Sequence, residues 1–582
     1  MNSKILKTLV FSFLVLFLFV GLSSGQEWVV TAGGDVSKVN VSQINLEQMT
    51  LREAIAKAVS GDTVVFAENI SVVQIMHGSL NLSKDLTIGG NSKVTVKRDS
   101  SPVTQDMTIF VVTGANVTFK QLIFENGYTS DGMGGAVSVD NANVTFEFCT
   151  IQKNKADIGG AIYVTNNGNV KLVSSTLHKN NATNEGSGIY INKGTVELQN
   201  SVVDGHSGKY NTILLNQGKF IASQSRFSNN EITSKGSPLT SYAGTTVEVR
   251  NSTFSNNTAV ESAGITSYGT LLVENCLFDG GKTSGSGGGI SLKNGSVGEI
   301  KYSLFSNANV SDDGGGVHID VGAKATMDTC TFVNNMAKYG GAFFSRGNLD
   351  VKSCTAVNNT AKFYGGAAAF WNDATTTMTQ TILAGNTAKS NNTAKDPAGG
   401  GLNISGSRAT LSNNIIVGNN DPREIDFGEY KSEIKSNGNN LVGIYRGDGK
   451  YPIHSTDAAG ILAEKVFVME NGFPALTKST GYTAGVDKAT VYTVALNNSP
   501  DNPALGVLGS GNVTPAPDVK PDVPDTNQTP DTNQTPDSEK PESGGFLKYL
   551  KYAFIGIVLL ILIAVAAVLL WKYNEKRKYK FG

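Results

Sequence analysis

One short phrase recurs along the middle of the chain at an almost constant interval. It consists of a small residue, any residue, a large apolar residue, two further residues and then Asn, as in CTIQKN (Cys149–Asn154), SRFSNN (Ser225–Asn230) and CTFVNN (Cys330–Asn335). Successive copies begin 24 to 27 residues apart, at Leu122, Cys149, Ser175, Ser201, Ser225, Ser252, Cys276, Ser303, Cys330, Cys354 and Thr381. A period held this closely is typical of a solenoid, in which every repeat forms the same structural unit.

A glycine-rich phrase, GGA or a close variant, runs in phase with the first. It occurs at Gly134, Gly159, Gly186, Gly287, Gly314, Gly340, Gly365 and Gly399. Each copy is followed by a short alternating segment such as AIYV or GVHI, and a second such segment comes a few residues later. Each period therefore holds about three strands of three to five residues, which are too short for helices or hairpin arms. Glycine is expected at the corners because it accepts backbone angles that a Cβ forbids.

These repeats predict an all-β fold, a right-handed parallel β-helix in which each period makes one circuit. Equivalent residues of neighbouring coils should then stack at the strand spacing of about 4.8 Å. We expect an internal aromatic ladder of Phe227, Phe254, Phe278, Phe305 and Phe332. We also expect a bend at which buried asparagines bond to one another, made by Asn154, Asn180, Asn230, Asn257, Asn335, Asn359 and Asn386.

The composition agrees with a fold held together by its core. The 582 residues include 65 glycines and only four cysteines, and the formal net charge is −1. This charge gives no reason to expect nucleic acid as a partner. The cysteines stand at the small position of the repeat, where we expect buried packing residues rather than a disulfide, and no spacing predicts a metal site or a cofactor.

The two ends of the predicted helix differ from its middle. Met49–Ser60 has apolar residues on one helical face, which predicts an amphipathic helix that caps the first coils within residues 26–105. The regular repeats occupy 106–420, and 421–508 is expected to form C-terminal coils and a cap. Covered ends matter because an exposed coil would pair with another molecule.

The terminal segments predict a cell-surface location. Residues 1–25 have the pattern of a secretory signal peptide, and 509–545 form a stalk rich in Pro, Asp and Thr that is expected to be disordered. Residues 546–571 contain an unbroken apolar stretch, Ala553–Trp571, long enough for one transmembrane helix. The basic tail 572–582 should remain cytoplasmic, which places the N-terminus and the β-helix outside a single-pass membrane protein.

The GGAI/GGAF and FxxN phrases resemble the repeats of polymorphic outer membrane proteins. LREAIAKAVSGDTVVF, which begins at Leu51, is similar to the opening of pectate-lyase-like and adhesin-like β-helix proteins. SNGNNLVG (Ser436–Gly443) and ENGFPAL (Glu470–Leu476) are similar to closing segments of surface proteins of that group. The resemblance implies a pectin-lyase-like β-helix with an adhesive role. The autotransporter domain of polymorphic outer membrane proteins has no counterpart here, so their secretion route is not implied.

Catalytic residues are sparse for a fold that many polysaccharide lyases and hydrolases share. Asp312 and Asp313 form the only adjacent acidic pair in the coils, and His318 follows on the next strand. Such residues could provide acid–base catalysis if they faced the same side. The alternative is a solvated turn beside a surface strand. Trp371 is the most noticeable aromatic candidate for a ligand contact, and it could equally be packed in the core.

Asn-X-Ser/Thr sequons are frequent, and they are either glycosylation sites or a consequence of turns rich in Asn and Thr. In the predicted coils they fall at Asn69, Asn81, Asn116, Asn143, Asn181, Asn251, Asn256, Asn309 and Asn403.

The sequence as a whole favours a non-enzymatic, adhesin-like or surface-architecture protein whose β-helix contacts an extracellular polysaccharide or protein. A membrane-tethered polysaccharide lyase, hydrolase or epimerase is the alternative.

Overall fold

A computed structural model describes residues 25–101, 105–390, 398–448, 451, 453–463, 466–470 and 473–476. The predicted signal peptide falls outside these residues except for Gly25, and the predicted stalk, transmembrane segment and tail fall outside them entirely. Within the described residues, no helix combines the length and the apolar character needed to cross a bilayer.

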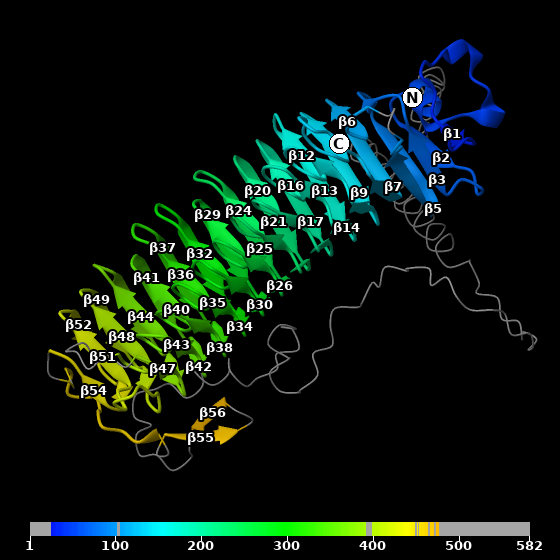
Figure 1. Ribbon diagram of the computed structural model, residues 1–582. Coiled ribbons are helices and arrows are strands. Elements are labelled where there is room, and N and C mark those ends of the chain that lie inside the picture. The colour runs from blue at the N-terminus through cyan, green and yellow to red at the C-terminus, as the bar shows by residue number, and fades with distance from the viewer. Residues whose placement is uncertain are drawn as a thin grey trace, which may run out of the picture. The chain divides into compact units, whose positions relative to one another are not determined.

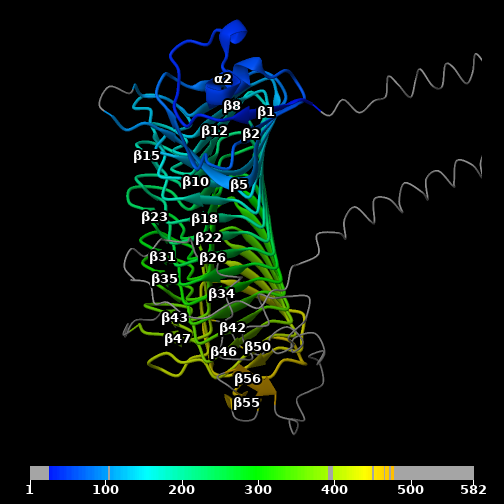
Figure 2. The ribbon, with the colours of Figure 1, turned by 90° about the vertical axis from the view of Figure 1, so that its right-hand side faces the viewer.

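Parallel strands stacked coil upon coil make up the described fold (Figures 1 and 2). The coil that contains Phe332 shows the pattern: β36 (Val317–Ile319), β37 (Lys324–Asp328), β38 (Thr331–Val333) and β39 (Met336–Ala337). Each strand pairs with its equivalent in the next coil, so that β36 pairs with β40 (Phe343–Ser345) in parallel. The predicted parallel β-helix is therefore confirmed as the architecture.

Each regular coil contains the three strands of three to five residues that the sequence predicts, and a fourth strand of only two residues, such as β39. A residue with positive φ, such as Thr329 (φ 59°), separates the two strands that each coil gives to sheet A, here β37 and β38. A second positive-φ residue, such as Asn334 (φ 57°), separates β38 from the two-residue strand β39. Asn tolerates this conformation better than most residues, which explains why so many repeats read Asn-Asn.

The strands form one 29-stranded sheet, which we call sheet A, one 15-stranded sheet, sheet B, and an 8-stranded sheet of short strands. Sheet B consists of β4 (Leu80–Leu82), β6 (Phe110–Thr113), β8 (Val137–Asp140), β12 (Ile162–Thr165), β16 (Ile189–Ile191), β20 (Ile213–Leu215), β24 (Leu239–Ser241), β28 (Ile265–Ser267), β32 (Ile290–Leu292), β36, β40, β44 (Ala368–Trp371), β48 (Leu402–Ser405), β51 (Phe427–Tyr430) and β54 (Tyr445–Arg446).

Sheet A receives two strands from each regular coil. Its longer strands include β13 (Gly168–Val173), β17 (Gly194–Gln199), β21 (Gly218–Ser223), β25 (Thr246–Arg250), β29 (Thr270–Glu274), β33 (Val297–Lys301), β37, β41 (Asn348–Lys352), β45 (Thr375–Thr379) and β49 (Arg408–Ser412). The 8-stranded sheet runs from β19 (Ser207–Gly208) to β47 (Thr387–Ala388). An antiparallel pair, β55 (Phe467–Glu470) and β56 (Phe473–Leu476), ends the described strands.

The predicted internal ladders are confirmed. Phe227, Phe254, Phe278, Phe305 and Phe332 stack face to face, with ring centroids 4.4 to 4.9 Å apart. The asparagines at the bend bond in series, as where the Asn335 Nδ2 and backbone N both donate to Asn359 Oδ1 at 3.0 Å. Such bonds satisfy buried amides that would otherwise destabilise the core. His206 replaces one asparagine in this row, Gly281 and Ala308 interrupt it between Asn257 and Asn335, and Asp426 accepts from Asn419 where the row ends.

Glycines allow successive coils to approach closely at the corner before sheet B. The first glycine of the phrase has positive φ, as at Gly314 (φ 70°). The second has no room for a side chain, because a Cβ at Gly315 would lie 1.8 Å from the carbonyl oxygen of Gly341. This corner therefore requires glycine for both conformational and steric reasons.

The N-terminal helix is shorter than predicted. Two 3-10 turns, η1 (Val41–Gln43) and η2 (Leu46–Gln48), precede α2 (Leu51–Lys57), which lies at the blue end of the stack in Figure 2. Thr50 and Glu53 form a capping box at its start, and Ala58 is already extended at its end. Leu51, Ala54 and Ile55 are buried against the first coils.

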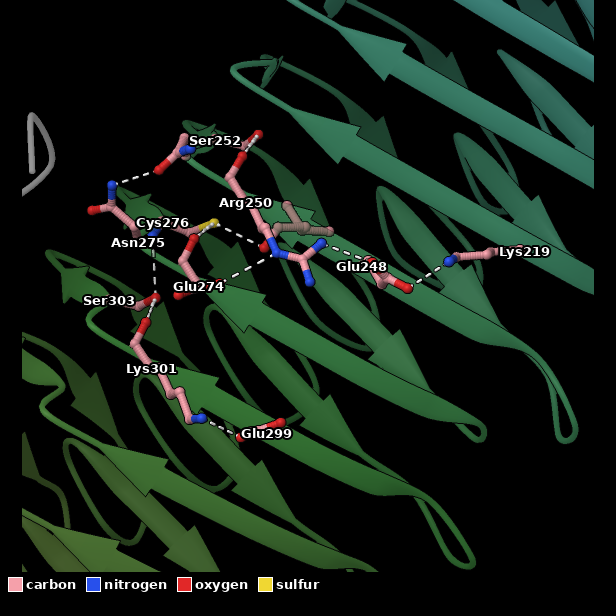
Figure 3. Close-up of polar contacts among 12 residues, drawn as sticks. Lys219, Glu248, Arg250, Ser252, Glu274, Asn275, Cys276, Glu299, Lys301 and Ser303 are labelled. Atoms are coloured by element: carbon pink, nitrogen blue, oxygen red, sulfur yellow. Dashed lines mark hydrogen bonds and ion pairs between the residues drawn. The ribbon is translucent and has the colours of Figure 1, made fainter. Parts of the chain in front are cut away.

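Figure 3 shows the outer face of sheet A and the small inward position beneath it. On the outside, Glu248 lies between Lys219 (2.6 Å) and Arg250 (2.7 Å), and Lys301 pairs with Glu299. Underneath, the Cys276 backbone N donates to Ser303 Oγ at 3.1 Å. The four cysteines are free and buried, as the sequence predicts, and burial raises the pKa of the Cys276 thiol to about 12. These thiols are packing residues.

Candidate functional site

The outer face of sheet B carries a row of side chains whose size changes from coil to coil. This row is formed by the middle residue of each strand, which points away from the core because side chains alternate along a strand. From the N-terminal side it reads Tyr163, Tyr190, Leu214, Thr240, Thr266, Ser291, His318, Phe344, Ala369 and Asn403. The three small residues Thr240, Thr266 and Ser291 lie between two groups of bulkier ones.

A depression of about 390 Å³, which we call the tyrosine depression, includes Thr240 of this row in its lining. Its one wall consists of residues just before the glycine corner, and its other wall consists of Tyr242 and Tyr268, which follow β24 and β28. The two tyrosine rings meet edge to face with centroids 6.1 Å apart. The wall before the corner includes Glu185, Tyr210, Lys235 and Glu261.

Burial and charge set the protonation of this depression. Burial raises the pKa of Glu185, while the nearby Lys235 and a hydrogen bond with the Tyr242 hydroxyl oppose that rise. Burial also raises the pKa of Tyr242 and Tyr268, and neighbouring carboxylates add to it. Both phenols therefore remain neutral hydrogen-bonding groups at ordinary pH. Two carboxylates here face one ammonium group.

Asp312 and Asp313 lie farther along the same wall, two coils beyond Glu261. Asp312 accepts from Ser286 Oγ at 3.1 Å and lies 3.7 Å from Lys338 Nζ. Asp313 is not the solvated turn residue of the alternative interpretation. Its Oδ1 is buried without a hydrogen-bond partner among the described residues. Burial, and then the charge of Asp312, raise the pKa of Asp313 to about 7, against the opposing effect of Lys338 and Arg346.

His318 is near these aspartates in the sequence but has different partners. Only 2% of it is exposed, which excludes the surface-strand interpretation. Its ring lies parallel to that of Phe344, with centroids 5.7 Å apart, and Nδ1 is 3.4 Å from Ser291 Oγ. Burial lowers the pKa of His318 to about 3, so the ring is neutral at ordinary pH. Among the described residues no hydrogen bond joins His318 to Asp312 or Asp313, and the three do not form one catalytic group.

Arg346 is the residue that faces both of these positions, and the sequence did not reveal it. It follows β40, donates from Nη2 to Asp320 Oδ1 at 3.0 Å, and electrostatically affects both Asp313 and His318. Its Nε is buried without a hydrogen-bond partner in the described part of the chain, as is His318 Nε2. Unsatisfied buried polar atoms on neighbouring coils mark a place where a ligand or water is needed.

Half-buried aromatic side chains gather at the next coils. Tyr339, Phe363, Tyr364 and Trp371, which we call the aromatic cluster, contact one another, with centroids of Tyr339 and Trp371 4.3 Å apart. Trp371 is neither fully exposed nor part of the interior, because its indole N donates to Asn403 Oδ1 at 2.7 Å on the outer side of the sheet.

These residues stand at fixed positions relative to the glycine-rich phrase, and that regularity could have revealed them from the sequence. Glu185, Asp313, Tyr339 and Tyr364 directly precede the first glycine of the phrase. Tyr242, Tyr268, Arg346 and Trp371 stand six residues after the equivalent first position. One side chain per coil at each offset therefore forms the two walls above sheet B.

The predicted sequons lie mainly outside the core. Those at Asn69, Asn81, Asn116, Asn143, Asn251, Asn256 and Asn309 are exposed and Asn181 is partly exposed. Asn403 differs, because only 2% of it is exposed and it holds the Trp371 indole. Its amide is therefore inaccessible in the folded chain.

Among the described residues, no group of three or more His, Cys, Asp or Glu side chains could hold a metal ion.

Comparison with protein families agrees with the architecture. A family model described as "Right handed beta helix region" matches residues 69–222 and 208–361, which together span half of the chain. A solved structure of a PL6 alginate lyase complexed with a trisaccharide is similar with a TM-score of 0.30 and 10% identity, over 79% of this chain and 93% of that one. A likeness of this size is not evidence for a shared activity. No curated protein matches the chain.

Proposed function

The chain belongs to the family of right-handed β-helix regions, and from that premise we propose that it is an adhesin-like cell-surface protein. Its ligand is an extended polysaccharide, bound along the outer face of sheet B. The observation that carries this proposal is the tyrosine depression, the place where that face is hollowed between aromatic and acidic walls.

The chemistry of the depression suits a sugar. The apolar faces of sugar rings pack on aromatic side chains, and Tyr242 and Tyr268 provide such surfaces together with hydroxyl groups. The carboxylates of Glu185 and Glu261 accept hydrogen bonds from sugar hydroxyls, and Lys235 donates. A few convergent polar groups in a partly apolar hollow are the usual composition of a ligand site.

The predicted terminal segments support a location of this face outside the cell. Under this proposal residues 1–25 direct secretion, 546–571 cross the membrane, and the stalk 509–545 holds the β-helix away from it. Helix α2 would cover the first coil and so prevent end-to-end association. Exposed sequons such as Asn251 would carry glycans in an organism that has N-glycosylation.

Asp313 supports a second candidate function, the cleavage or modification of the polysaccharide. A carboxyl group with a pKa of about 7 is half protonated at neutral pH, as a general acid or base should be. It lies on the same wall as Glu185 and Glu261, where a bound chain would pass.

The experiment that tests both candidates measures binding and chain length together. The full-length protein is incubated with labelled neutral, acidic and amino-sugar polysaccharides, and the bound fraction and the polymer length are recorded. We expect binding without shortening, unchanged in an Arg250→Ala control on sheet A. Shortening that Asp313→Asn abolishes would establish the enzyme instead. If no polymer binds or shortens, both candidates are wrong.

A further inference from the structure

The aromatic cluster presents rings at the surface in a fixed arrangement. Tyr339 and Tyr364 are nearly parallel, with an angle of 11° between planes and centroids 5.9 Å apart. Trp371 is held by its bond to Asn403 and packs edge to face on the buried Phe344, with centroids 5.7 Å apart. Rings immobilised in this way lose little entropy when a ligand stacks on them.

The aromatic cluster continues the walls of the tyrosine depression. Tyr339 and Tyr364 belong to the same wall as Glu185 and Glu261, and Trp371 occupies on its coil the place that Tyr268 occupies on its own. Four coil spacings separate Tyr268 from Trp371, which is about 19 Å along the β-helix. One straight ligand lying along sheet B would therefore contact both places.

Beneath the surface between these places lie polar atoms that have no partner among the described residues. Asp313 Oδ1, His318 Nε2 and Arg346 Nε are buried, and no described group bonds to them. They lie on two successive coils, those of β36 and β40. Leaving such atoms unsatisfied is costly, so a hydroxyl-rich ligand or ordered water is expected there.

The charges along this path favour an uncharged ligand. The Lys338 and Arg346 cations already face carboxylates, at 3.7 Å from Asp312 and 3.0 Å from Asp320. In the tyrosine depression Lys235 acts electrostatically on Glu185, and Glu261 adds a second carboxylate to the lining. Lys293, which follows β32 between Tyr268 and Asp320 on one wall, is a further cation, but one such cation does not make the row that a polymer of uronic acids needs.

We propose that Tyr339, Tyr364 and Trp371 form a second sugar-stacking subsite, which acts on the same chain as the tyrosine depression. The ligand is then a linear, uncharged polysaccharide long enough to span about 19 Å. This inference rests on the proposed function, because it assigns the ligand class and length of that site.

The test is a length series measured with the full-length protein. Neutral oligosaccharides from disaccharide to octasaccharide, made of glucose or of N-acetylglucosamine, are titrated by calorimetry, with oligogalacturonates of equal lengths beside them. We expect affinity to rise with length until both subsites are bridged and then to level. Trp371→Ala should weaken the longest neutral ligand about tenfold and leave the shortest unchanged. Tyr242→Ala should weaken both.

Controls separate this inference from a folding defect and from the proposed function. Tyr364→Ala repeats the test without breaking the bond between Trp371 and Asn403. Tyr302→Ala removes an exposed tyrosine (42%) that belongs neither to the middle row of sheet B nor to its two walls. If Tyr242→Ala weakens binding while Trp371→Ala and Tyr364→Ala bind the longest ligand as the wild type does, only the second subsite is wrong. If oligogalacturonates bind more tightly, the ligand class is wrong. If no oligosaccharide binds, the proposed function itself fails.

Discussion

The outer faces of sheets A and B are built from the same coils, but their outward side chains have different kinds of partners. On sheet A, charged residues pair with the next coil or with their own strand, as Glu248 does with Lys219 and Arg250 (Figure 3). On sheet B, aromatic and acidic residues surround a hollow, and buried polar atoms lack partners among the described residues. Buried polar atoms without a described partner also occur on sheet A, at Thr331 Oγ1 and Thr355 Oγ1, so the hollow with its aromatic and acidic walls is what distinguishes sheet B. Function is therefore expected on sheet B.

The largest effect should come from removing the aromatic wall of sheet B. We expect Tyr242→Ala combined with Tyr268→Ala to weaken polysaccharide binding about 100-fold, because both ring surfaces of the tyrosine depression are lost. Calorimetric titration measures this, with Arg250→Ala as the matched change on sheet A. Equal losses in the two variants would remove the distinction between the faces.

A smaller, pH-dependent effect should come from Asp313. Its pKa of about 7 in the folded chain lies above the ordinary value, so its stabilising protonated form is present at low pH and is lost as pH rises through about 7. The Tm of the Asp313→Asn variant minus the Tm of the wild type should therefore be about 2–4 °C larger at pH 8 than at pH 5. Thermal unfolding at both values measures the gain.

Asp426 also has a raised pKa, about 6, but it is present in both proteins and cancels in this difference. If the difference in Tm between the two proteins is the same at pH 5 and pH 8, Asp313 is not buried in the folded chain.

The smallest effect should come from the ion pairs of sheet A. Glu248→Gln leaves Lys219 and Arg250 without that carboxylate, yet exposed ion pairs contribute only about 0–1 kcal/mol. We expect the free energy of unfolding to change by at most about 0.5 kcal/mol, and less at high salt. Urea unfolding at low and high ionic strength measures it. A loss above about 2 kcal/mol would mean that this face depends on its charges.

The interior of the fold could be predicted from the sequence and the site could not. Phe305 packs on Phe278 and Phe332, and Asn335 bonds to Asn359, so the period itself reveals each partner. Outside the core, equivalent positions of neighbouring coils do not need the same type of residue. Glu185, Tyr242 and Arg346 share only a register offset, and their neighbours along a wall are chemically unlike them. His318 looked exposed because the residue that covers it, Phe344, is on the next coil.

The glycine corner also fixes how the distance between the two sugar contacts could change. Each coil adds one residue to each wall and cannot be compressed, because Gly315 already lies against the next coil. The separation between Tyr268 and Trp371 can therefore change only by whole coils, in increments of about 4.8 Å. The spacing between the two sugar contacts is therefore quantised by the coil repeat. A variant of the protein with one repeat fewer or more would bind a shorter or longer saccharide, and neither contact would change.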